Sequence, residues 1–339
     1  MPKAAINPNN VRQAAKVNDI QGEMRVDAYL TNFALSYRQA ENQFIARRAS
    51  TPVPVNNESD KYAIFPRGYF WRDEAEVRPL GGRPVQVGYK VENGQYLAEE
   101  WALEHTIDER QRRNAAAPYD LDESGVMLLE GKQMIREDRF WAERAFKENV
   151  WVHDYDGATD FDPFNDATTD PVATVTRYKR ILGKGSGFKA NTMILGANVI
   201  DALVTNPAMI DRTKFGAAQG IVDEAFIARA FGIQNIMVAE SMYNAANEGA
   251  DDDFQYIVDE DSFWIGYVEP QPRMDAPTAI ARFAWTGLIP GVMNKMGGVI
   301  TRGRDDRAYS DWIHSRNAFD IKVVAPDLGL FFTNAVIEA

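Results

Sequence analysis

The stretch from Asp120 to Asn149 constrains the fold more than any other part of the chain. It contains no proline, and its apolar residues come in pairs that recur every seven positions. Because seven residues make nearly two helical turns, these pairs form one apolar stripe along a single helix. The residues predicted to pack through this stripe are Met127, Leu128, Met134, Ile135 and Trp141. At 1.5 Å rise per residue, such a helix would be a rod of about 40 Å, much longer than the average helix.

The flanks of this helix carry further signals. Asp120 followed by Glu123 resembles a capping box, which favours a helix start at this point. Charged residues, Asp138 among them, are predicted to lie mostly off the apolar stripe. Two interpretations fit this pattern. One is an ordinary long core helix, which the helix alone favours, and the other is a spine on which a sheet is laid.

The segment before the helix has the pattern of strands. From Tyr62 to Ile107, aromatic and β-branched clusters alternate with charged runs. Residues 79–84 have the composition of a loop tip, and Asn93-Gly94 is a strong hairpin signal because both residues tolerate positive φ. So much charge and so little continuous hydrophobicity cannot build a core. We therefore expect a long β excursion that lies on another part of the structure.

The segment after the helix is predicted to be a compact mixed α/β unit at about 171–290. A helix from Ile221 to Phe231 should be closed by Gly232 in the left-handed conformation. Phe254–Val258 and Phe263–Val268 are expected to form a pair of strands around an acidic turn. At the other end of the chain, a polar N-terminal arm precedes a short helix predicted within 22–47.

Composition bounds the possible functions. The chain has 339 residues, a net charge of −12 and no cysteine, which excludes disulfides, thiolate metal sites and cysteine nucleophiles. Its acidic balance argues against a main task of gripping nucleic acid and suits a surface that does not adhere to nearby DNA. No apolar run approaches the length of a membrane helix. The N-terminus lacks the apolar segment of a signal peptide, so we expect the protein to stay in the cytoplasm where it is made.

No catalytic motif stands behind an enzymatic interpretation. Gly183-Lys184-Gly185-Ser186-Gly187 fails the spacing of a phosphate-binding loop, so a flexible loop is expected there. The three histidines lack the spacing of a metal site. The acidic stretches 154–162 and 251–253 are expected to be solvated, and a structural Ca²⁺ or Mg²⁺ is the less favoured alternative. The sequence thus predicts no catalytic, cofactor-binding or metal-binding residues.

Two sets of residues are candidates for contacts between subunits. The basic cluster of the chain suits an intersubunit ion-pair site better than a nucleic-acid patch, because the protein is acidic. The predicted assembly residues are Leu80, Gly81, Gly82 and Arg83 at the loop tip, and Arg110, Arg112 and Arg113 in the basic cluster.

Three stretches in order, 94–146, 191–250 and 319–336, resemble the major capsid proteins of tailed bacteriophages with the Hong Kong 97-type fold. Their phrases include GQYLAEEWALEHTIDERQRRN, NTMILGANVIDALVTNPAMIDRTKFG and FDIKVVAPDLGLFFTNAV. The resemblance implies an α+β fold with an N-terminal arm (1–50), an extended E-loop β-hairpin (51–107), a peripheral domain with the spine helix (108–165), a mixed α/β axial domain (166–295) and closing strands of the peripheral domain (296–339).

The same resemblance implies a non-enzymatic major capsid protein without cofactors. Its pentamers and hexamers would form an icosahedral shell that encloses double-stranded DNA without sequence-specific binding. A separate scaffolding protein and a portal would be partners, a decoration protein is left open, and no membrane is involved. The expected location is the virion, assembled in the host cytoplasm. The alternatives are an encapsulin-like nanocompartment and, less favoured, a soluble α/β enzyme without a recognisable motif.

Overall fold

The computed structural model describes residues 39–115, 120–214, 222–273, 276–288 and 298–337. Helices and strands are mixed, and most strands fall into two sheets of five. The first, here called the long sheet, contains β1 (Thr51–Val55), β4 (Glu99–Asp108), β11 (Ile280–Trp285), β12 (Gly298–Asp305) and β13 (Ser310–Val323). The second, the compact sheet, contains β5 (Asp154–Asp156), β6 (Thr192–Leu195), β7 (Asn235–Val238), β10 (Phe263–Gly266) and β14 (Gly329–Thr333).

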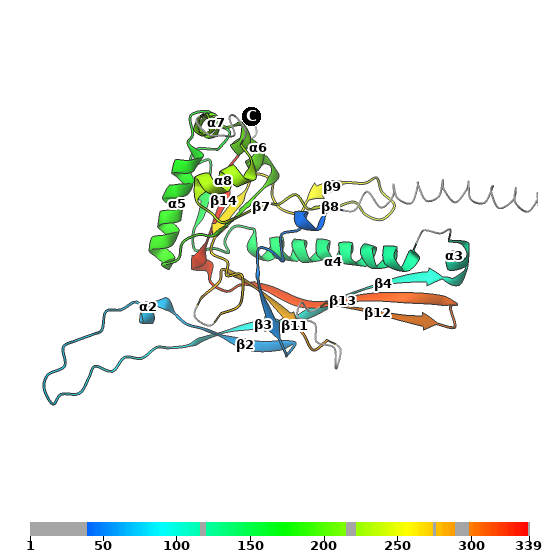
Figure 1. Cartoon of the computed structure of the whole chain (residues 1–339), viewed down its shortest axis with the longest axis horizontal. Helices are drawn as coiled ribbons and strands as arrows, with labels where there is room; N and C mark the ends of the chain where they lie inside the picture. The colour runs from blue at the N-terminus through cyan, green and yellow to red at the C-terminus, as the bar shows by residue number, and fades with distance from the viewer. Residues whose placement is uncertain (1–38, 116–119, 215–221, 274–275, 289–297, 338–339) are drawn as a thin grey trace, which may run out of the picture.

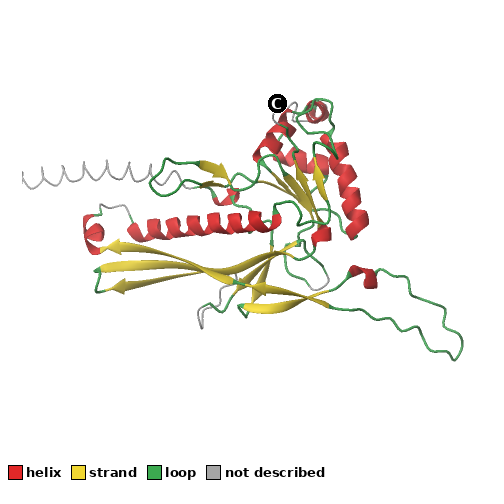
Figure 2. Ribbon diagram, turned by 180° about the vertical axis from the view of Figure 1, so that it is seen from behind, coloured by secondary structure: helices red, strands yellow, loops and turns green. Residues whose placement is uncertain are grey.

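The predicted spine is a single helix, α4 (Leu121–Ala145), of 25 residues. Figures 1 and 2 show it running along the long sheet, with the compact sheet at its C-terminal end. The Asp120 side chain accepts hydrogen bonds from the backbone N–H groups of Asp122 and Glu123, at 2.9 and 3.3 Å, so this residue begins the helix as expected. The helix ends at Ala145, before the predicted Asn149, and the indole of Trp151 donates to the Ala145 carbonyl at 2.8 Å, which satisfies one of the carbonyls that a helix end leaves unpaired.

The buried face of α4 differs from the predicted stripe. Met134 and Trp141 are buried and Met127 and Ile135 are half-buried, but Leu128 is 48% exposed. Every fourth residue is buried instead: Gly125, Leu129, Gln133, Glu137, Trp141 and Ala145. A row of every fourth residue is inclined to the helix axis, so the buried face winds around the helix. The seven-residue recurrence of apolar pairs in the sequence had instead indicated a straight stripe. Contrary to expectation, Asp138 is also buried.

The compact sheet is covered on both faces. One face carries α5 (Pro171–Ser186), α6 (Ala197–Thr205), α7 (Pro207–Thr213) and α8 (Glu224–Phe231). In β14, Leu330 and Phe332 pack in the cluster beneath these helices, whereas Phe331 packs in the cluster at the end of α4. This last strand therefore lies in the compact sheet, between β5 and β10. A strand that is apolar on both faces needs a sheet covered on both faces.

Three local expectations inside this region have clear outcomes. Gly232 has a φ of +60° and closes α8, as predicted. Phe254–Val258 and Phe263–Val268 do not pair, because β9 (Phe254–Tyr256) pairs with β8 (Met242–Asn244) and β10 lies between β14 and β6. The glycine-rich segment after Leu182 is not a flexible loop: it is the last turn of α5, capped by Gly187 at a φ of +75°.

The β excursion exists, but its turn is not at Asn93-Gly94. Both residues lie inside β3 (Glu92–Leu97), which pairs with β2 (Ser59–Ile64). Gly94 faces Tyr62 across the pair, and a Cβ there would lie 2.2 Å from the tyrosine ring. The chain reverses at the tip, where Gly81 has a φ of +79° and the Gly82 N–H donates to the Pro79 carbonyl at 2.9 Å. Between β2 and the tip lies a single turn of helix, α2 (Arg67–Phe70).

The predicted domain boundaries are crossed by the two sheets. β1 and all of β4 except its last residue fall within the predicted E-loop and β11 within the predicted axial domain, yet all three lie in the long sheet. The domain limits themselves stay a prediction. The N-terminal arm and most of the predicted helix at 22–47 lie outside the described residues; within 39–47 there is only η2 (Glu41–Gln43). None of the described helices has the length and hydropathy to cross a bilayer.

The contrast between two residues of the predicted stripe can be measured. Trp141→Ala should lower the free energy of unfolding of the subunit by about 3–5 kcal/mol, because it leaves a large cavity under α4. Leu128→Ala, at a half-exposed position, should cost less than about 1 kcal/mol. Urea denaturation followed by circular dichroism gives both values. Equal losses for the two variants would mean that the buried face is assigned wrongly.

Candidate assembly surfaces and a buried charge centre

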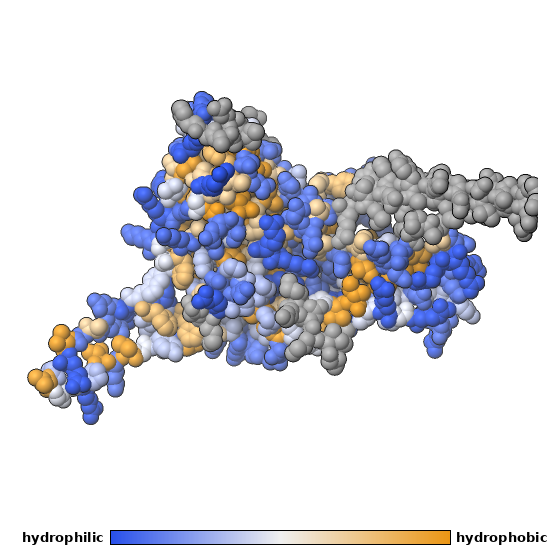
Figure 3. Space-filling model, viewed as in Figure 1, coloured by the Kyte–Doolittle hydropathy of each residue, from blue (hydrophilic) through white to orange (hydrophobic). Residues whose placement is uncertain are grey.

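The projecting arm, defined as residues 56–98, carries most of the exposed apolar side chains of the described chain. These residues are Phe65, Phe70, Trp71, Val77, Leu80, Val85, Val87, Tyr89, Val91 and Leu97. Val77 and Leu80 are almost fully solvated. Figure 3 shows apolar side chains exposed along this arm among hydrophilic ones. Contiguous exposed apolar surface on a folded chain marks a site of contact with another molecule.

The root of the arm is fixed to the body of the protein. Phe283 of β11 stacks against the rings of Tyr62 and Tyr96, at centroid distances of 5.2 and 4.7 Å. Arg67 forms an ion pair with Asp327, beside the start of β14. The Trp71 ring lies against Gly187 so closely that a Cβ there would be 2.2 Å from it. Beyond this root, Figure 1 shows the tip projecting away from both sheets.

The predicted residues of the tip lie together at its turn. Leu80, Gly81 and Arg83 are exposed, and Gly82 is half-buried against Pro79. Within the part of the chain that the structure describes, Arg83 has no ion-pair partner. The structure therefore brings these four residues into one surface. Their role in assembly stays a proposal.

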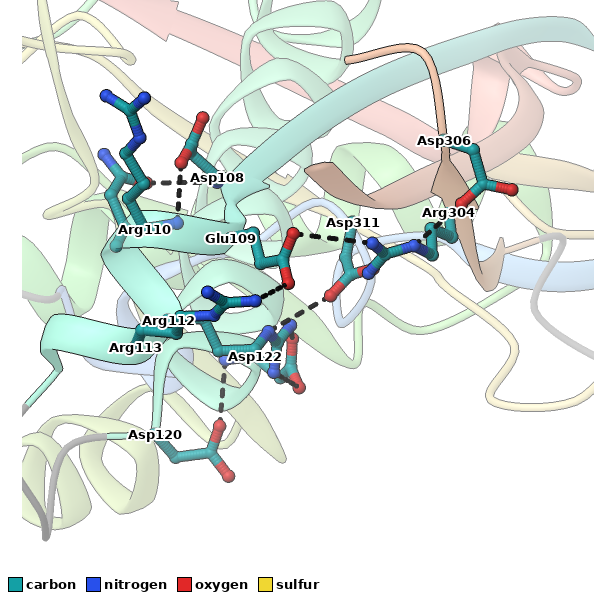
Figure 4. Close-up of polar contacts among 11 residues, drawn as sticks. Asp108, Glu109, Arg110, Arg112, Arg113, Asp120, Asp122, Arg304, Asp306 and Asp311 are labelled. Atoms are coloured by element: carbon teal, nitrogen blue, oxygen red, sulfur yellow. Dashed lines mark hydrogen bonds and ion pairs between the residues drawn. The ribbon is translucent and has the colours of Figure 1, made fainter. Parts of the chain in front are cut away.

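The predicted basic cluster lies on α3 (Glu109–Asn114), near the start of α4 (Figure 4). Arg112 contacts Asp122 at 2.8 Å and Asp311 at 3.1 Å, while Arg113 contacts Glu109. Arg304 of β12 joins the same group of carboxylates. These contacts tie α3, α4 and the β12–β13 turn together within one chain. The role of Arg112 and Arg113 in ion pairs between subunits stays a prediction.

Arg110 differs from Arg112 and Arg113 because its guanidinium lies outside this ion-pair network. Its backbone N–H donates to the Asp108 side chain at 2.7 Å, in the cap of α3. Figure 4 shows its guanidinium extending away from the network of Arg112 and Arg304. The intersubunit ion pair stays a prediction for this residue.

A buried charge centre that the sequence did not reveal lies on α4. Glu137 and Arg282 are both 1% exposed and form an ion pair, and Arg47 contacts the second oxygen of Glu137 at 2.9 Å. Arg282 comes from β11, and Arg47 comes from the segment that leads into β1. The one signal in the sequence is a single arginine within the apolar strand Ile280–Trp285, which requires a buried partner of opposite charge.

The neighbouring carboxylate, Asp138, holds the N-terminal segment of the described chain. It accepts hydrogen bonds from the backbone N–H groups of Ile45 and Ala46, at 3.1 and 2.8 Å, and from the Ser241 hydroxyl at 2.8 Å. Burial raises the pKa of Asp138 to about 6, although these hydrogen bonds oppose the shift, and the charge of Glu137 adds to it. A pocket of about 400 Å³ lies beside the two carboxylates.

Both carboxylates are occupied in joining chain segments. Glu137 binds two guanidinium groups, and Asp138 binds three hydrogen-bond donors from two segments. Among the described residues, no group of three or more His, Asp or Glu side chains is placed to hold a metal ion. The arrangement therefore fixes α4, β11 and residues 45–47 in one geometry.

Solved structures with a similar fold include phage-related and shell-forming proteins. A phage-related protein from Bordetella bronchiseptica RB50 matches with a TM-score of 0.67 at 18% identity, over 92% of this chain and 98% of that one. The encapsulin complex of Synechococcus elongatus PCC 7942 matches with a TM-score of 0.54 at 11% identity, over 88% and 89%. The capsid of Cyanophage P-SCSP1u matches with a TM-score of 0.52 at 11% identity, over 84% and 86%.

The chain thus has the Hong Kong 97-type fold, which it shares with this phage capsid and this encapsulin. No protein-family model matches it. A curated relative is the major capsid protein of Burkholderia phage BcepMu, which is 27% identical over 223 residues, or 64% of this chain and 70% of the relative. The resemblance found in the sequence is therefore confirmed for the fold and for the relationship to a phage capsid protein.

Breaking the buried ion pair should be costly. Glu137→Ala leaves Arg282 buried without this carboxylate, so the free energy of unfolding should fall by about 3–5 kcal/mol. The matched control is Asp211→Ala, which removes the exposed pair with Lys214 and should cost less than about 1 kcal/mol. Urea denaturation of both variants checks this. A loss at Glu137 no larger than that at Asp211 would exclude a buried charge centre.

Asp138 should make stability depend on pH in a defined direction. Its folded pKa of about 6 lies above its unfolded value of 3.8, so its favourable contribution is complete below pH 3.8 and is lost as the pH rises through 6. The loss between pH 4 and pH 7 should be about 2 kcal/mol. Asp138→Asn cannot titrate and should lack this component. The measurement is urea denaturation of both proteins at several pH values, and a difference between them that stays constant across pH would contradict the assignment.

Proposed function

We propose that the chain is the major capsid protein of a tailed bacteriophage and that its copies assemble into an icosahedral shell around double-stranded DNA. The observation that carries the proposal is the projecting arm, which exposes ten large apolar side chains on a chain with the Hong Kong 97-type fold. The arm cannot bury these side chains in its own subunit. In a shell, neighbouring subunits supply the missing surface.

The relationship to the capsid protein of phage BcepMu supports a phage shell in particular. Pentamers and hexamers of this chain would be the building units, and the location would be the virion, after assembly in the host cytoplasm. We infer that a scaffolding protein and a portal are further partners. The net charge of −12 favours an inner wall that encloses DNA without binding it specifically.

An encapsulin-like compartment is the second candidate, because the encapsulin of Synechococcus elongatus has the same fold with a TM-score of 0.54. Such a shell would enclose protein cargo instead of DNA. Treatment of purified particles with nuclease after opening, followed by analysis of nucleic acid and protein content, distinguishes the two. A soluble enzyme, the remaining alternative, would form a small discrete oligomer.

The role of the arm tip can be tested by substitution. Leu80→Asp combined with Val87→Asp should leave the subunit folded, since both side chains are exposed, but should prevent normal shells. Ile337→Asp, at an exposed apolar position outside the arm, is the matched control and should assemble normally. Negative-stain electron microscopy and sedimentation velocity of the expressed full chain report shells, and circular dichroism reports folding.

Normal shells from the tip variant would remove the arm from the assembly surface. If the unaltered chain forms only dimers or tetramers, even when produced with the neighbouring phage proteins, the capsid proposal fails as a whole.

A further inference from the structure

A basic face runs along α5, on a chain that is acidic overall, and Arg177 of this face lies over the Tyr178 ring of the same helix, 5.5 Å from its centroid. Arg177, Arg180 and Lys184 follow one another at helical spacing and are all exposed. Pro171–Ser186 contains neither Asp nor Glu, and among the described residues none of these three cations forms an ion pair. Here they are called the basic stripe of α5.

Lys179, the other lysine of α5, forms hydrogen bonds within the chain. The Lys179 ammonium donates to the backbone carbonyls of Phe231 and Gly232, the latter at 3.0 Å, and so closes the C-terminal end of α8. The stripe has no such task within the chain. Figure 3 shows hydrophilic side chains at the outer edge where α5 lies.

A surface of opposite charge lies on the other side of the compact sheet. The loop between β8 and β9, residues 245–253, contains four acidic residues and no lysine or arginine, and all four are exposed. Its shape is fixed from within, because Asn244 donates to Asp252 at 2.7 Å and accepts from the Asp253 N–H at 3.0 Å. Glu248 and Asp251 take no part in these contacts. Both views in Figures 1 and 2 place this loop and α5 on opposite sides of the compact sheet.

The projecting arm leaves the protein on the side of α5. Its Trp71 rests against Gly187 at the end of that helix, and Figure 1 shows α2 below α5. The root of the arm and the C-terminal end of the helix that carries the basic stripe therefore lie side by side. Two complementary surfaces on opposite sides of one chain form a head-to-tail contact, which closes into a ring when the rotation between copies allows it.

We propose that the basic stripe of α5 binds the acidic β8–β9 loop of the next copy of this chain around each ring of the shell. This inference rests on the proposed function, since it requires that copies form rings. The pairs are exposed, so their main effect is on orientation and partner choice, while the arm supplies apolar contact. Like charges brought face to face in every contact of a ring oppose closure.

Charge reversal and its rescue test the contact. Arg180→Glu with Lys184→Glu should fold normally and lower the yield of shells about tenfold or more. Glu248→Lys with Asp251→Lys should do the same. Because the two sets exchange their charges, the chain that carries all four substitutions should regain shells. The matched control is Lys132→Glu with Lys147→Glu, which makes the same change of charge at exposed positions of α4 and beyond its end.

Each result has a defined meaning. A loss no greater than that of the control, or a fourfold variant that does not recover, overturns the contact and leaves the capsid function standing. Shells of normal yield that contain less DNA would assign the stripe to DNA phosphates and also overturn it. Circular dichroism and thermal melting of each variant exclude unfolding as the cause.

A second measurement does not depend on shells. The chain has no cysteine, so Lys184→Cys with Asp251→Cys provides two defined thiols. A short bis-maleimide should join them between copies and give a ladder on a denaturing gel that ends at five or six subunits. Either single-cysteine variant should give no species above a dimer. A double variant without a ladder contradicts the contact, whether or not shells form.

Discussion

The buried carboxylate of Glu137 is the contact on which the arrangement of this fold depends. It joins three segments that are far apart in the sequence: the long helix, the strand β11 through Arg282, and the N-terminal segment through Arg47. Buried ion pairs are often no more stabilising than apolar side chains of the same volume. We infer that the main effect of this centre is on specificity, because an arginine inside an apolar strand allows only the register in which it meets the carboxylate.

The long helix can position both sheets because its buried face winds along its length. Near its start, Gly125 allows a close approach to His105 of the long sheet, where a Cβ would lie 2.6 Å from the imidazole ring. At its C-terminal end, Trp141 and Phe146 lie together, and Phe146 in turn meets Phe331 of the compact sheet at a centroid distance of 5.0 Å. One helix therefore fixes the relative placement of the two sheets, and with it the direction in which the arm leaves the body.

Local signals in the sequence predicted local structure well. The absence of proline together with apolar periodicity predicted α4, Asp120 marked its start, and Gly232 marked the end of α8. Features that depend on contacts between distant residues could not be found in this way. Asn93-Gly94 has the composition of a turn, but its glycine is required by the ring of Tyr62 on the opposite strand.

For the candidate surfaces too, features set by neighbouring residues in the sequence could be predicted, whereas contacts between distant residues could not. The tip at Leu80 and Gly81 could be predicted because a turn has its own composition, whereas the partners of Arg112 come from β13 and from the start of α4. Charge in a sequence does not reveal whether a side chain is paired. The structure makes that distinction: it pairs Arg112, Arg113 and Arg282 within the chain and leaves the basic stripe of α5 exposed. The exposed apolar side chains of the arm and the exposed cations of α5 are therefore two features of the described chain that its own fold does not pair, and both are surfaces on which the proposed contact with another copy rests.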